Sequence, residues 1–119
     1  NPAALTYDPA FAYEVAAIVK DGLRRMYGEA APGEDPNVFY YLTIYNEPIL
    51  QPAEPAEVDV EGLLKGIYRY APAPETSGPR AQLLASGTGM QWALKAQQEL
   101  GQDPAWPIPY GYAVRRRAK

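Results

Sequence analysis

The strongest structural signal of this sequence lies in the stretch DPAFAYEVAAIVKDGLRRMYG, residues 8–28. Asp8 is a residue type that caps helices, and Pro9 suits the first helical position. Gly28 is a natural C-terminal stop. Apolar side chains recur between them at helical spacing on one broad face: Phe11, Val15, Ile18, Val19, Leu23 and Met26. We therefore predict an amphipathic helix over residues 9–27.

The next structured stretch is NVFYYLTIY, residues 37–45, in which β-branched and aromatic residues dominate. Alternate positions are largely apolar on both sides of the chain, which favours a strand buried on both faces. Such strands are typical of parallel sheets that are covered by helices above and below. A helix followed by a strand of this kind is half of an α/β repeat.

The rest of the chain continues in short elements, because thirteen prolines interrupt it. Residues 46–57 are predicted to be irregular, and APAPETSGP at 71–79 reads as a linker. The predicted regular elements are a short helix at 58–66, a short strand at 67–71, a strand at 80–86 and a helix at 87–100. The predicted fold class is α/β: a partial parallel sheet with flanking helices.

Composition excludes several classes of function. The 119 residues contain no cysteine and no histidine, so disulfides, thiolate sites and histidine bases are ruled out. A net charge of −3 argues against a dedicated nucleic-acid binder. No apolar run reaches the roughly 20 residues of a membrane span, and no signal-peptide pattern opens the chain. We expect a cytoplasmic protein without a membrane or nucleic-acid partner.

Asn46 and Glu47 directly follow the predicted strand 37–45. Loops at the carboxyl ends of strands in open α/β sheets are where ligands usually bind. The simpler interpretation is that Asn46 caps the turn and Glu47 is solvated.

Three other polar features have plain explanations. The turn SGTG at 86–89 could hold an anion, but a tight turn between strand and helix explains it as well. An acidic stretch could bind a cation, although acids are favoured in the first turn of a helix anyway. The basic chain end could contact phosphate or be an accidental end. These last two features comprise Glu54, Glu57, Asp59, Glu61, Arg115, Arg116, Arg117 and Lys119.

Five blocks in one order resemble a known family. They are YDPAFAYEVAAIVKDGLRRMYGE (7–29), NVFYYLTIYNEP (37–48), QPAEP (51–55), EGLLKGIYRY (61–70) and QLLASGTGM (82–90). They are similar to the thiamine-diphosphate-dependent decarboxylating component of bacterial pyruvate dehydrogenase, in its homodimeric class. The run NEPILQPAEP makes the likeness strongest to the actinobacterial branch. The resemblance covers residues 5–100.

The resemblance implies a transketolase-like fragment with two parts. Residues 1–70 would end the middle, pyrimidine-binding domain, 71–79 would be the linker, and 80–100 would begin the C-terminal domain. Residues 101–119 would be a divergent tail. Its three prolines lead us to expect that it adds little to the core, although alternate aromatic residues there could lie along a sheet edge.

The resemblance also implies a substrate-proximal loop that contains Asn46, Glu47, Leu50 and Gln51. Some family members carry NENYH in this loop, and Leu50 stands where their histidine would be. No catalytic, cofactor-binding or metal-binding residue of the family has a counterpart in this chain.

For the intact enzyme the resemblance implies thiamine diphosphate and Mg²⁺ as cofactors. It implies a homodimer and a lipoyl acyltransferase component as partners. The segment by itself is expected to bind neither cofactor, to be inactive and to self-associate. The alternative hypothesis is a non-enzymatic α/β interaction module, which would bind a protein partner through exposed aromatic surface.

Overall fold

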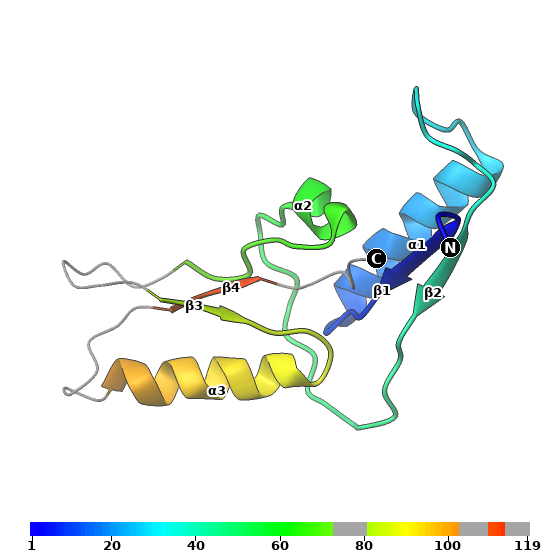
Figure 1. Ribbon diagram of the computed structural model, residues 1–119. Helices are drawn as coiled ribbons and strands as arrows, with labels where there is room; N and C mark the ends of the chain where they lie inside the picture. Colours follow the sequence, from blue (N-terminus) through cyan, green and yellow to red (C-terminus); the bar gives the residue numbers. More distant parts are fainter. Residues whose placement is uncertain (73–80, 103–109, 114–119) are drawn as a thin grey trace.

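The computed structural model describes residues 1–72, 81–102 and 110–113, and these form two β-α-β units (Figure 1). The first unit contains β1 (Ala4–Tyr7), α1 (Ala12–Tyr27) and β2 (Phe39–Leu42). A short helix, α2 (Val60–Lys65), follows it. The second unit contains β3 (Ala81–Leu84), α3 (Gly89–Gln102) and β4 (Tyr110–Ala113).

The first unit is a parallel pair of strands with α1 alongside (Figure 1). β1 pairs with β2 in a register that places Leu5 opposite Tyr40. Gly22 of α1 faces the ring of Tyr40, and a Cβ at Gly22 would be in ordinary contact with that ring at 3.4 Å. The predicted α/β class with parallel strands is thus confirmed. β1 was not predicted, because four residues are too few to show a pattern.

The start of α1 differs from the prediction. The helix begins at Ala12, and Phe11 holds the extended N-cap position (φ −128°, ψ 156°). Asp8 therefore lies before the helix and does not cap it. The carboxylate of Glu14 takes over this role, accepting hydrogen bonds from the N–H groups of Ala10 (2.6 Å) and Phe11 (3.3 Å). A carboxylate in the first turn satisfies backbone donors that have no partner within the helix.

Two predicted apolar faces are only partly buried. On α1 the buried residues are Glu14, Ile18 and Gly22, whereas Val19 and Leu23 are 45% and 55% exposed. On β2 the side chains of Phe39 and Tyr41 are 50% and 60% exposed. The prediction that this strand is buried on both faces is therefore wrong for the described chain, since α1 and α2 cover only one face of the β1–β2 pair.

The short helix predicted at 58–66 is present, whereas the strand predicted at 67–71 is absent. α2 begins after Asp59, whose carboxylate accepts from the N–H of Gly62 at 2.8 Å. It ends at Gly66, which has a left-handed conformation (φ 100°) that favours glycine. Residues 67–71 form no strand. Within them, only Arg69 takes part in an isolated β-bridge, which is a single backbone pairing. Tyr68 instead turns its ring into the core, where it is 4% exposed.

The second unit repeats the first in its order and strand direction. β3 and α3 confirm the predicted strand and helix, and β4 pairs with β3 in parallel, with Ala81 opposite Tyr110. Residues 101–119 were expected to add little to the core, with a strip along a sheet edge as the alternative; of these residues, 110–113 pair with β3 as that alternative describes. The prolines at 104, 107 and 109 all precede this strand, so they do not interrupt its ladder. The linker and the arginines at 115–117 lie outside the described residues, apart from Ala71 and Pro72.

Two small apolar clusters hold the described chain together. The first lies between the β1–β2 pair, α1 and α2, and contains Leu5, Tyr7, Ile18, Leu63 and Tyr68. The second joins the two units through Phe11 and Met90, with Leu83 packed against them. The Tyr7 and Tyr40 rings stack at 6.0 Å in the first cluster. Within the described residues no buried side-chain polar atom lacks a hydrogen-bond partner.

Candidate functional site

The loops that follow β1, β2 and β3 meet at one place, and Asp8 lies at its centre. Asp8 comes directly after β1, Tyr45 follows β2, and Ser86 follows β3. The hydroxyl of Tyr45 donates to Asp8 Oδ1 at 2.8 Å, and that of Ser86 donates to Asp8 Oδ2 at 2.7 Å. The carboxyl ends of the parallel strands β1 and β2 are thereby joined to the carboxyl end of β3, which belongs to the other sheet. The carboxyl ends of strands are the usual location of ligands in α/β sheets.

Backbone contacts bring this edge close together. The N–H of Gly87 donates to the carbonyl of Asp8 at 3.2 Å, and the N–H of Thr43 donates to that of Tyr7 at 3.0 Å. Gly87 has a φ of 51°, and a Cβ there would lie 2.6 Å from the hydroxyl oxygen of Tyr45. Glycine is therefore required both for the backbone conformation and for the approach of the tyrosine ring.

Of the four residues predicted for the substrate-proximal loop, two line one hollow and two lie outside it. Glu47 and Gln51 line a hollow of about 150 Å³ together with Thr43, Tyr45 and Thr88. The side-chain oxygen of Gln51 accepts a hydrogen bond from the N–H of Ala12 at 2.9 Å. Asn46 and Leu50 do not line the hollow, and Leu50 is 96% exposed. Only half of the predicted set is therefore gathered at one site.

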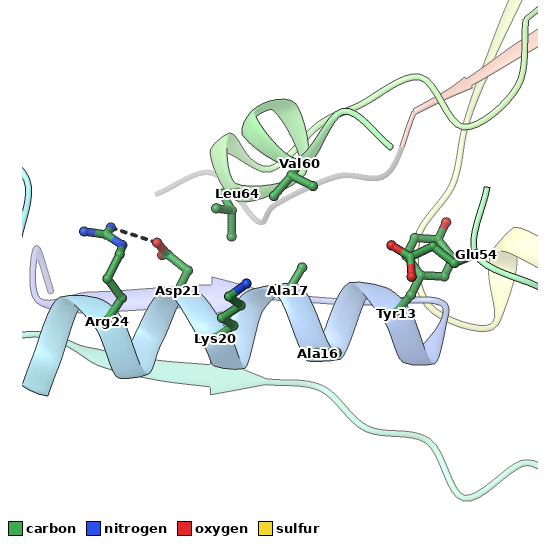
Figure 2. Close-up of a pocket in the computed structure, with 9 residues that line it drawn as sticks. All are labelled: Tyr13, Ala16, Ala17, Lys20, Asp21, Arg24, Glu54, Val60 and Leu64. Atoms are coloured by element: carbon green, nitrogen blue, oxygen red, sulfur yellow. Dashed lines mark hydrogen bonds and ion pairs between the residues drawn. The ribbon is translucent and has the colours of Figure 1, made fainter. Parts of the chain in front are cut away.

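A larger hollow of about 510 Å³ lies between α1 and α2 (Figure 2). Its α1 wall carries Tyr13, Lys20 and Asp21, and Figure 2 shows Val60 and Leu64 opposite on α2. Glu54 closes the end nearest Tyr13. Asp21 is occupied by an ion pair with Arg24 at 2.8 Å and accepts from the hydroxyl of Tyr40 at 2.8 Å. The hollow therefore combines apolar walls with charges of both signs.

A buried chain of polar groups connects this hollow to the interior. Glu14 is 1% exposed, and its Oε1 accepts from the hydroxyl of Tyr68 at 2.6 Å. The hydroxyls of Tyr68 and Tyr13 lie 2.5 Å apart. With the two backbone donors already described, both carboxylate oxygens of Glu14 are satisfied. Such a network satisfies the hydrogen-bonding capacity of a buried polar side chain.

The surroundings of the tyrosines disfavour their ionised forms. Burial raises the pKa of Tyr13 to about 12. Burial, followed by the hydrogen bond to Glu14, raises the pKa of Tyr68 far above its ordinary value. The hydrogen bond to Asp8 raises the pKa of Tyr45, because a phenolate could not donate to the carboxylate. All three hydroxyls are thus protonated donors at neutral pH.

The other polar features have structural roles in the described residues. Asp59 caps α2, and Glu61 pairs with Lys65 on the same helix. The turn at 86–89 connects β3 to α3, and its serine binds Asp8. No group of three or more acidic side chains in the described ranges is arranged to hold a metal ion. No helix in those ranges is long and apolar enough to cross a membrane.

Sequence reasoning missed the roles of Asp8 and Glu14. Asp8 was predicted to be a helix cap, but it binds Tyr45 and Ser86, 37 and 78 residues away along the chain. Glu14 has a local signal that could have found it: it is an acid in the first turn of an amphipathic helix, three residues after the N-cap position. Asp8 has no such signal, because its partners are distant in sequence.

Comparisons with known proteins agree with this structural picture. The family model described as the middle domain of the pyruvate dehydrogenase E1 component matches residues 1–52. The pyruvate dehydrogenase E1 component of Mycolicibacterium smegmatis is 62% identical over 109 residues, which cover 91% of this chain and 11% of that protein. The one from Mycobacterium tuberculosis is 53% identical, with the same coverage. The one from Escherichia coli is 43% identical over 86% of this chain and 11% of that protein.

One expectation about the extent of the resemblance is wrong. A match over 91% of the chain cannot end at residue 100 of 119, so the similarity continues into the part that we expected to diverge. The higher identity to the mycobacterial proteins than to the Escherichia protein agrees with the expected actinobacterial character.

The chain spans about 11% of the length of each of these relatives. Its five sequence blocks, its parallel β-α-β units and its matches point to the same family. Over most of its length the chain is similar to one segment of the pyruvate dehydrogenase E1 component, which confirms the resemblance inferred from its motifs.

Proposed function

We propose that this chain is a segment of the decarboxylating component of a pyruvate dehydrogenase complex. The observation that carries the proposal is 62% identity to one such component over 91% of the chain. The intact enzyme would be a cytoplasmic oxidoreductase that decarboxylates pyruvate and passes the acetyl group to lipoyl. Residues 1–70 would complete its middle domain and 80–100 would begin the next domain, with the junction at 71–79.

The intact enzyme would use thiamine diphosphate and Mg²⁺, which supply the electron sink for decarboxylation when bound. The described residues do not fit a metal–diphosphate site, because they gather no set of three acidic ligands. We propose that the groups that hold the cofactor lie in other parts of the intact enzyme. The partners would be a second copy of the enzyme and a lipoyl acyltransferase component.

The contribution of the segment would come from the loop 46–51. Glu47 and Gln51 line the hollow beside Thr43 and Thr88, so they would orient polar groups of the substrate there. Leu50 would not take part in proton transfer, because its side chain is aliphatic. Asn46 would contact the substrate only after the loop meets the remainder of the enzyme, since it does not line the hollow in this chain.

A hybrid enzyme tests the proposal. The matching segment of the Mycolicibacterium smegmatis relative is replaced by this chain, and pyruvate-dependent reduction of an artificial electron acceptor is measured. We expect activity within about tenfold of the parent. A folded dimeric hybrid with no activity would contradict the proposal. A hybrid that carries a scrambled 46–51 loop serves as the control, and it should lose activity without losing its fold.

The alternative is a non-enzymatic interaction module, and exposed Phe39 and Tyr41 favour it. The DNA that flanks the coding sequence separates the two proposals. An upstream reading frame that encodes the rest of the enzyme supports the segment. A start codon and ribosome-binding site directly before Asn1 support the module.

A further inference from the structure

We propose that Asp8 is a positioning residue that fixes the loop 43–51 to the turn between β3 and α3. The inference rests on the proposed function in one respect, which is that this loop approaches the substrate. Asp8 itself is not assigned to the chemistry. It would act through Tyr45, by setting where the loop leaves the sheet.

The geometry of Asp8 joins two separate parts of the chain. Each carboxylate oxygen accepts one hydroxyl, from Tyr45 at 2.8 Å and from Ser86 at 2.7 Å. Its main-chain carbonyl accepts the N–H of Gly87 at 3.2 Å. One residue thus connects the first β-α-β unit, through the loop after β2, with the start of the second unit. Hydrogen bonds to an ionised carboxylate are stronger and more directional than those between neutral groups.

Besides Tyr45, the loop is attached at both of its ends. At the β2 end, the N–H of Thr43 donates to the carbonyl of Tyr7 at 3.0 Å. Gln51 accepts from the N–H of Ala12 at 2.9 Å and so holds the far end of the loop against the start of α1. Between Tyr45 and Gln51 the side chains of Asn46, Glu47 and Leu50 are exposed. The path of this span is therefore defined by the contacts of Tyr45 and Gln51. Releasing Tyr45 leaves the chain after Thr43 without a side-chain contact to Asp8.

The chain offers a matched control for this hydroxyl. Tyr40 lies on β2, and like Tyr45 it donates its hydroxyl to an aspartate, Asp21, at 2.8 Å. That contact lies between β2 and α1, away from the loops at the carboxyl ends. Tyr45→Phe thus removes the proposed positioning contact, and Tyr40→Phe removes a bond of the same type elsewhere in the protein.

The first experiment is amide hydrogen exchange on the full chain. Tyr45→Phe is expected to speed exchange in residues 43–51 about tenfold, whereas Tyr40→Phe should leave that loop unchanged. Ser86→Ala should speed exchange at 86–90. In an Asp8→Ala background neither Tyr45→Phe nor Ser86→Ala should add anything, because their common acceptor is gone. Unchanged exchange of the loop in Tyr45→Phe, or full additivity with Asp8→Ala, would overturn the proposal.

The second experiment uses the hybrid enzyme, and its failure is distinguishable from failure of the first. Tyr45→Phe is expected to raise KM for pyruvate about fivefold with kcat changed by less than twofold, while Tyr40→Phe changes neither. This split is the sign of a displaced binding loop, because a general loss of fold would lower the amount of active enzyme and hence kcat. Faster loop exchange with unchanged KM would overturn the role in positioning substrate. An inactive hybrid would reject the proposed function, and the exchange data would still decide the role of Asp8.

Discussion

A methyl group at Gly87 has no room beside Tyr45. The backbone at Gly87 is left-handed (φ 51°), and a Cβ would lie 2.6 Å from the tyrosine hydroxyl oxygen. We expect Gly87→Ala to lower the free energy of unfolding by about 1–3 kcal/mol, as measured by urea denaturation. Gly89→Ala is the matched control, since nothing lies within 4 Å of its Cβ position at the start of α3. Equal effects of the two substitutions would contradict the assigned contact.

The buried tyrosines predict how stability depends on pH. In the unfolded chain these groups ionise near pH 10, whereas Tyr13 has a folded pKa of about 12 and that of Tyr68 is also raised. The unfolded state therefore loses protons first, so the contribution of these tyrosines to the free energy of unfolding is constant below pH 10 and falls as pH rises from about 10 to 12. Thermal midpoints between pH 8 and 11.5 measure this slope.

Tyr68→Phe checks the origin of that slope. It removes one donor to buried Glu14 and is expected to cost roughly 1–3 kcal/mol at pH 7. It should also flatten the fall above pH 10. Tyr41→Phe, at a position that is 60% exposed, should change neither quantity. A wild-type slope in Tyr68→Phe would show that other tyrosines cause the loss.

At the residue scale, contacts between residues that are far apart in the sequence could not be predicted. Glu47 and Gln51 could be placed near a site because they follow a recognisable strand. The bonds from Tyr45 and Ser86 to Asp8 could not be predicted, because they depend on how three loops meet after folding. The burial of Glu14 could not be predicted for the same reason. Its hydrogen-bond donor Tyr68 lies 54 residues away and was expected to belong to a strand.

Among the secondary-structure elements, β4 gives the clearest prediction. It is the parallel partner of β3, so its removal would leave the backbone groups of β3 without that ladder. We expect truncation after Gln102 to lower the thermal midpoint by on the order of 5 °C. Truncation after Ala113 keeps β4 and is the control. Equal thermal midpoints for the two truncated chains would show that β4 does not contribute to stability.

The elements that sequence predicted best have strong local signals. α2 has an aspartate before it and a left-handed glycine after it, and both signals stand in the sequence. α1 was predicted within three residues at its start, although its buried face was misjudged because Val19 and Leu23 are apolar but exposed. β1 and β4 have four residues each and derive their stability from pairing with strands elsewhere in the chain, which no local pattern records.

For the whole molecule, the exposed face of the β1–β2 pair predicts self-association. Phe39 and Tyr41 project on the side away from α1, and exposed aromatic surface of this kind favours contact between copies. Sedimentation velocity should show an average mass that rises with protein concentration. A double variant, Phe39→Ser with Tyr41→Ser, should shift the chain toward monomer. A concentration-independent monomer in the parent chain would contradict this prediction.

The central claim is that this chain supplies one loop to a site whose cofactor-holding groups lie elsewhere in a larger enzyme. Titration calorimetry of the isolated chain with thiamine diphosphate and Mg²⁺ tests it most directly, with the hybrid enzyme as the positive control. We predict saturable binding by the hybrid and none by the isolated chain. Saturable binding by the isolated chain tighter than about a millimolar dissociation constant, roughly −4 kcal/mol, would contradict the claim.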